Sequence, residues 1–287
     1  MSNTELPFIK SILHPTDFSP ASEKAFAHAL AIALIRQTEF TILNVGDNKS
    51  KGSEWEQFPA VRKTLERWGL LEKGSPREAV FEQLGMRIRK SVQSGTTARS
   101  AILKYLEGNP VDLIVLATEG RGGLPRWLSR SKAEAIAQAS NAITLFVPEE
   151  GKSFIQLENG DISLQRILLP IDHQPSPTAA IIYATRAAQA LAVDNTVEIV
   201  LLHIGNDETA FNLDLPENPN WRFRKETRSG DPVEAIISAA NEFSSDIIIM
   251  TTAGHEGIFD ALRGSTTEQV LRKACCPLLA VPQSWSK

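Results

Sequence analysis

The sequence is poor in cysteine, which limits the kinds of site it can form. Of its 287 residues only two are cysteines, and they are neighbours, Cys275 and Cys276. Adjacent cysteines offer no disulfide framework and lack the spacing of a zinc site. The chain is therefore unlike disulfide-rich secreted domains and unlike proteins that fold around cysteine-bound metal.

Long apolar runs and a large excess of one charge are also missing. No run approaches the roughly 20 apolar residues that span a bilayer, and Met1 to Glu5 have neither the basic start nor the apolar core of a signal peptide. We therefore expect a cytoplasmic protein without membrane contact. The net charge is −4, with 19 basic and 17 acidic residues up to position 150 and 11 and 17 beyond it. Neither half has the basic excess of a nucleic-acid binder, so no nucleic-acid partner is expected.

What the sequence does contain is an internal duplication. Four residues of the first half align with four of the second at a constant offset of 134: Asp112, Gly120, Ser131 and Pro148 with Asp246, Gly254, Ser265 and Pro282. The segment 12–17 matches 167–172 at an offset of 155, so the first copy holds 21 extra residues. We predict domains at 1–150 and 164–287, a polar linker at 149–164, and an inserted segment at about 49–90 in the first domain.

Each copy alternates apolar strands with helices. Strands are predicted at 9–14, 40–45, 86–92, 113–116 and 143–147, and then at 167–171, 197–203, 223–226, 247–250 and 278–281. Helices are predicted at 21–35, 98–106, 132–139, 178–191, 232–241 and 266–274. This pattern indicates an α/β fold of two tandem doubly wound domains, each with a five-stranded parallel sheet and helices on both faces. Because each last strand would leave an apolar edge, we expect 143–147 and 278–281 to pack together as an internal pseudo-dimer.

A candidate anion site follows the strand at 247–250. Gly264 permits close approach of an anion, and Ser265 and Thr266 add hydroxyls beside the unpaired N–H groups of a helix start. In doubly wound sheets, ligands bind at the carboxyl ends of the strands near the switch in strand order. The residues expected at that edge are Asp17, Gly46 and Gly120 in the first copy and Asp172, Gly205 and Gly254 in the second.

Together these residues resemble a tandem member of the universal stress protein family. ATP-binding members of that family carry Gly-x2-Gly-x9-Gly-(Ser/Thr) after the fourth strand and an aspartate after the first. The second copy has this spacing with Thr251 in place of the leading glycine. The resemblance implies that domain 2 binds ATP or a related adenine nucleotide, with Mg²⁺ as an additional ligand left open. It assigns this site to Ile171, Asp172, His203, Ile204, Thr251, Gly254, His255, Gly264, Ser265 and Thr266.

The first copy departs further from the family pattern. Ala117 and Arg130 replace two of the three glycines, so we expect a degenerate site at Asp17, Gly120, Arg130 and Ser131. An arginine cannot enter a close-approach glycine position without filling the space. The alternative is that the Arg130 guanidinium itself holds a phosphate or carboxylate, helped by Arg121 and Arg126. Either way, the two copies should differ in function.

Several alternatives stay open at this point. His173, His203 and His255 fall near Asp172, which permits a metal site, although their separation in sequence is unspecific. Asp172 alone could be a turn former after a strand, and His203 a packed core residue. The inserted segment, with Trp55, Phe58, Leu65, Trp68, Leu70 and Leu71, is interpreted as core or as a lid over a domain face.

Three functions follow from these alternatives. The first is a nucleotide-binding stress-response or regulatory protein that is not an enzyme and acts on an unidentified protein partner, as a pseudo-dimer or a homodimer of chains. The second is a structural or interaction module that binds no nucleotide. The third is slow ATP hydrolysis, for which the sequence offers no general base with defined geometry.

Overall fold

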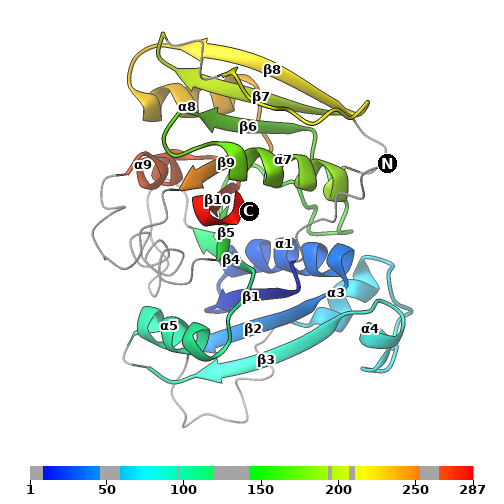
Figure 1. Ribbon diagram of the computed structural model, residues 1–287. Coiled ribbons are helices and arrows are strands. Elements are labelled where there is room, and N and C mark those ends of the chain that lie inside the picture. Colours follow the sequence, from blue (N-terminus) through cyan, green and yellow to red (C-terminus); the bar gives the residue numbers. More distant parts are fainter. Residues whose placement is uncertain are drawn as a thin grey trace.

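The chain forms one continuous ten-stranded sheet covered by helices on both faces (Figure 1). The computed structural model describes residues 9–45, 59–95, 97–118, 142–192, 196–206, 211–252 and 265–286. Within these ranges, no helix is long and apolar enough to cross a membrane.

The elements follow the predicted order. The strands of the first half are β1 (Ser11–Thr16), β2 (Glu39–Val45), β3 (Arg87–Gln93), β4 (Leu113–Thr118) and β5 (Ile143–Pro148). Its described helices are α1 (Pro20–Arg36), α3 (Val61–Arg67), α4 (Ala79–Glu82) and α5 (Ala98–Gly108). The second half contains β6 (Arg166–Ile171), α7 (Thr178–Leu191), β7 (Val197–Ile204), β8 (Trp221–Arg228), α8 (Pro232–Glu242), β9 (Ile247–Thr252), α9 (Thr266–Lys273), β10 (Leu278–Pro282) and η2 (Gln283–Ser286). All ten predicted strands are present, while the helix predicted at 132–139 lies outside the described residues.

The two predicted five-stranded sheets join edge to edge. The strand order is β3-β2-β1-β4-β5-β10-β9-β6-β7-β8, and all pairs within a half are parallel. Strands β5 and β10 pair antiparallel, with Leu145 opposite Leu279. The prediction that the last strands of the copies meet is therefore confirmed, and Figure 1 shows this pair in the centre with β3 and β8 at the outer edges.

Alternate residues of the strands feed two cores on opposite faces. Ile12 and Leu145 lie in a core with α1 and α7, whereas their neighbours Leu13 and Phe146 lie in a core with α5, α8 and α9. The first core includes residues of both halves because the sheet is continuous across β5 and β10. The molecule therefore has three layers, helix, sheet and helix, as the family resemblance implies.

The outer edges of the sheet are charged. Strand β3 carries Arg87, Arg89 and Lys90, and strand β8 consists of exposed and half-buried residues, with Arg224 and Lys225 both exposed. Charged edge strands resist pairing with another chain. Arg87 and Arg89 are exposed while Lys90 is half-buried, and the apolar edges are the two that pair internally.

A carboxylate fixes the start of the fourth strand of each half to the start of the first. The Asp112 Oδ2 atom accepts hydrogen bonds from the N–H groups of Lys10 (2.8 Å) and Ser11 (3.0 Å). The Asp246 Oδ2 atom accepts the same pair of bonds from Gln165 and Arg166, both at 2.8 Å. The donors of the two halves correspond at the offset of 155 and the aspartates at the offset of 134, so both copies retain this contact.

The linker predicted to be polar is instead packed into the structure. Phe154 and Ile155 are buried, because these apolar residues of an otherwise polar segment cover the junction between the two half-sheets. Lys152 pairs with Asp246 at 2.8 Å, and the Leu157 carbonyl accepts a 3.0 Å bond from the indole N–H of Trp68. The segment is therefore a structural connector between the halves.

The inserted segment belongs largely to the core where it is described. Leu65, Trp68 and Leu71 are buried, whereas Leu70 is 38% exposed. Residues Trp55 and Phe58 lie outside the described residues. For Leu65, Trp68 and Leu71 the core interpretation therefore holds.

Removing the carboxylate at Asp246 should destabilise the fold. We expect Asp246→Ala, and Asp112→Ala in the first half, to lower the free energy of unfolding by about 1 to 3 kcal/mol, because two backbone N–H groups lose their acceptor. Urea denaturation measures the difference. The control is Asp214→Ala, which removes an exposed carboxylate and should change stability by less than about 0.5 kcal/mol. Equal effects at Asp246 and Asp214 would contradict the structural role.

Candidate functional site

The candidate site of the second half lies where the strand order reverses. Strands β6 and β9 are neighbours, with Ile167 beside Ile247, and β7 lies on the other side of β6, with His203 beside Ile171. Four predicted residues, Ile171, Asp172, His203 and Thr251, therefore meet at one edge, the carboxyl ends of three parallel strands. This is the crevice position at which doubly wound sheets bind ligands.

Much of the predicted phosphate loop lies outside the described residues. Gly254, His255 and Gly264 lie outside the described residues, as do Gly120, Arg130 and Ser131 of the degenerate site and Gly46. The described part of the site consists of the strand ends and the start of α9.

The aspartates that follow the first strand of each half differ in their surroundings. The Asp17 Oδ1 atom accepts bonds from the Ser19 N–H (3.0 Å) and the Ser22 hydroxyl (2.8 Å), so this carboxylate forms the turn into α1. Asp172 is exposed, and among the described residues its carboxylate accepts a bond only from the adjacent His173 N–H, at 2.7 Å. The turn-former interpretation therefore suits Asp17, whereas Asp172 keeps acceptor capacity for a ligand.

A buried polar side chain at the end of the second strand binds the end of the first strand in each half. The Asn44 amide donates to the Thr16 carbonyl at 2.9 Å, and the His203 Nδ1 atom lies 3.4 Å from the Ile171 carbonyl. The sequence alone did not reveal this equivalence, because an amide and an imidazole do not align by type. His203 is 4% exposed, so its side chain acts in packing, and its backbone would form any ligand contact.

Thr251 replaces the first family glycine and has a structural partner. Helix α7 begins after Pro177 without a side-chain cap of its own. The Thr251 hydroxyl accepts a 3.2 Å bond from the Ala180 N–H in the first turn of this helix. Thr251 thus supplies, from β9, the acceptor that an N-cap residue normally provides.

The start of α9 has hydrogen-bond donors without an acceptor among the described residues. Ser265 is the N-cap, and its Oγ atom accepts a 3.1 Å bond from the Glu268 N–H. Within the part of the chain that the structure describes, the N–H groups of Thr266 and Thr267 have no acceptor. The Ser265 hydroxyl can still donate its proton, so this helix start offers several donors and the positive end of a dipole to an anion.

The described histidines near the site do not assemble a metal centre. His173 is exposed, while His203 turns its Nδ1 atom toward a backbone carbonyl. Across the described ranges, no three His, Cys, Asp or Glu side chains are grouped so that they could hold a metal ion. His255, the third histidine of that alternative, lies outside them.

Comparisons with known proteins agree with this architecture. The model of the universal stress protein family matches residues 9–148 and 222–282. The chain belongs to the universal stress protein family. A family member from Methanocaldococcus jannaschii is 31% identical over 149 residues, covering 50% of this chain and 84% of that protein. Shorter alignments cover 42% of a universal stress protein from Methanothermobacter thermautotrophicus, at 41% identity over 22% of this chain, and 18% of a universal stress protein E homologue from Haemophilus influenzae, at 39% identity over 20% of this chain.

Solved family structures share the whole tandem arrangement. A universal stress protein from Archaeoglobus fulgidus superposes with a TM-score of 0.62 at 18% identity, covering 96% of this chain and 99% of the other. A putative universal stress protein from Pseudomonas aeruginosa gives 0.61 at 13% identity, covering 97% and 95%. At these identities the likeness shows the fold.

Stability should depend on pH through two buried histidines. Burial lowers the pKa of His14 in β1 and of His28 in α1 from 6.5 to about 4. Unfolding restores the ordinary pKa, so between pH 6.5 and 4 the unfolded chain binds protons that the folded chain does not. Stability is therefore complete above about pH 6.5 and falls as the pH is lowered to 4, by up to about 3 kcal/mol per histidine. Urea denaturation across this range should give a shallower pH dependence for His28→Asn than for the unchanged chain. An unchanged slope would contradict the assignment.

Proposed function

We propose that the second domain binds an adenine nucleotide, ATP or a close relative, and that the protein is a regulatory stress-response protein that acts by changing conformation. The observation that carries this proposal is the contrast between the two aspartates. Asp17 is bound within its own turn, whereas Asp172 exposes a carboxylate at the switch point. Such a carboxylate can accept hydrogen bonds from ribose hydroxyls or hold Mg²⁺ bound to the phosphates.

The start of α9 supports the phosphate end of this proposal. Ser265 and Thr266 follow Gly264, which stands at the family position for close approach of a phosphate, and the N–H groups of Thr266 and Thr267 have no described acceptor. Helix starts of this kind bind phosphates because their donors and dipole both favour negative charge. Recognition of the adenine base is assigned to the backbone around His203 and Ile204.

A binding role is favoured over catalysis by the position of the described polar groups. Hydrolysis needs a general base within hydrogen-bond reach of the attacking water. His203 is buried and its Nε2 atom does not reach solvent, so it is not positioned to activate a water, and Asp172 is the exposed carboxylate that directly follows β6. We therefore propose that the nucleotide acts as a signal for an unidentified protein partner. The proposal includes a cytoplasmic site of action, which two free cysteines fit.

The second candidate is an interaction module without a nucleotide. Thr251 favours it, because its side chain occupies the position of a family glycine and is bonded to α7. Titration of the whole chain with ATP separates the candidates, since the module should bind none.

Nucleotide binding should be confined to one site per chain. Calorimetric titration with ATP and Mg²⁺ should give a stoichiometry near one, and Asp172→Ala should weaken binding roughly 10-fold to 100-fold through loss of a charged hydrogen-bond acceptor. The matched control is Asp17→Ala, which should leave the affinity unchanged. Two equivalent sites per chain, or equal losses in both variants, would contradict the proposed asymmetry.

A second test replaces Gly264 of the second copy with arginine, the residue at the equivalent position 130 of the first copy. Gly264→Arg should abolish ATP-induced thermal stabilisation by filling the phosphate position, a loss of at least about a hundredfold in affinity. The ligand-free melting temperature should move by only a few degrees, because the first copy already holds arginine at the equivalent position. Gly264→Ala serves as the smaller substitution. Wild-type affinity in Gly264→Arg would show that Gly264 does not line the site.

A further inference from the structure

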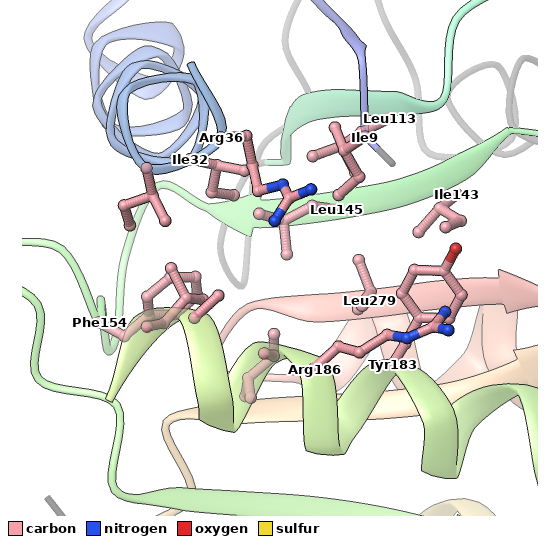
Figure 2. A pocket seen from close by; sticks show the side chains of 15 residues that line it. Ile9, Ile32, Arg36, Leu113, Ile143, Leu145, Phe154, Tyr183, Arg186 and Leu279 are labelled. Atoms are coloured by element: carbon pink, nitrogen blue, oxygen red, sulfur yellow. The ribbon is translucent and has the colours of Figure 1, made fainter. Parts of the chain in front are cut away.

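A cavity lies between the two halves, away from the nucleotide edge. Its volume is about 90 Å³, and it lies between α1 and α7 above the β5 and β10 pair (Figure 2). Ile32, Leu145, Phe154 and Leu279 form part of an almost wholly apolar wall. Since these residues come from both halves and from the connector, neither domain forms this cavity alone.

The cavity contains a hydroxyl group without a partner. Tyr183 of α7 is 5% exposed, and its OH group is buried with no hydrogen-bond partner among the described residues. In Figure 2 the Tyr183 hydroxyl points into the space below Ile143 and Leu145. Burial raises the pKa of Tyr183 to about 12, so the group remains an O–H donor at neutral pH. A buried donor that makes no bond is a place where a ligand acceptor gains most.

Two guanidinium groups flank the same space from opposite helices. Arg36 at the end of α1 has a buried Nε atom with no described partner, and Arg186 of α7 lies over the Tyr183 ring at 5.4 Å. Neither arginine forms a salt bridge within the described part of the chain. The carboxylate acting on Tyr183 is Asp112, whose Oδ2 atom already accepts bonds from Lys10 and Ser11. Among the described residues, this apolar cavity thus carries two positive charges that have no salt-bridge partner.

We propose that this cavity binds an amphipathic monocarboxylate, a short-chain or medium-chain fatty acid. The hydrocarbon chain would lie on the apolar wall over β5 and β10, and the carboxylate would accept hydrogen bonds from Arg36, Arg186 and the Tyr183 hydroxyl. Guanidinium groups match a carboxylate geometrically and are weakly hydrated, which suits a half-buried position. A volume of about 90 Å³ holds the carboxylate and the first carbons of a fatty acid, and the rest of the chain would extend along the apolar wall where the cavity opens to solvent. The cavity is lined by the last turn of α1 and the middle and end of α7, whereas nucleotide binding is assigned to the start of α9.

Calorimetric titration of the full chain with octanoate tests this proposal. Octanoate should bind at one site per chain and raise the melting temperature. Octan-1-ol and acetate should each bind at least about tenfold more weakly, because the first lacks the charge and the second lacks the chain. Equal affinity for octanoate and octan-1-ol, or no binding of octanoate, would overturn the proposal.

Three variants locate the binding site. Arg186→Gln and Arg36→Gln should each weaken octanoate binding about tenfold, and Tyr183→Phe should weaken it several-fold. The control is Arg224→Gln on β8, which removes an arginine outside the cavity and should leave the affinity unchanged. Circular dichroism identifies any variant that fails to fold, and the remaining variants then decide the result. Full affinity in the folded variants would overturn the assignment.

Two further measurements distinguish a fatty-acid site from the nucleotide site and from a binding site for this chain's own N-terminal segment. Octanoate binding should persist in Gly264→Arg, so its outcome is independent of the nucleotide site. If octanoate binds only after residues 1–8 are deleted, the cavity is the seat of this chain's own N-terminal segment and the proposal is overturned.

Discussion

The antiparallel pairing of β5 with β10 is the contact on which the rest of the structure depends. It joins two parallel half-sheets into one and removes the apolar edge that each half would otherwise expose. The charged strands β3 and β8 are left at the outside. Because the sheet is continuous, α1 and α7 share one core with the connector, so the halves are parts of a single folded unit.

Within this continuous sheet, the two copies share contacts to backbone atoms more closely than they share the residues of the candidate site. Asp112 and Asp246 bind equivalent N–H groups, and Asn44 and His203 act on equivalent carbonyls although their side chains differ. Asp17 has become part of a turn, whereas its counterpart at position 172 is exposed. A contact to a backbone atom is needed by any sequence with this fold, while a ligand contact can be lost from one copy when the other retains it.

Most of the fold could be predicted from the sequence, because apolar periodicity is a local signal and the duplication repeats it in the second half. The bounds of α7 were predicted residue for residue, and those of the strands to within about three residues. Roles that arise only in three dimensions were missed. The buried Phe154 stands in a polar segment. Thr251 caps α7 by accepting a bond from Ala180, which is 71 positions away in the sequence. The cavity around Tyr183 also escaped prediction, since it exists only once the halves are joined.

The cap on α7 has a mechanical consequence. Thr251 stands at the carboxyl end of β9, two residues before the segment that leads to α9, so the first turn of α7 is held by an acceptor from another element. A shift of the β9 end would release the Ala180 N–H and loosen that turn. The same helix carries Tyr183 and Arg186 to the junction with α1. Helix α7 thus connects the end of β9 with the domain junction, so a ligand that changed binding at one of these places through α7 would be affected to the same extent by binding at the other.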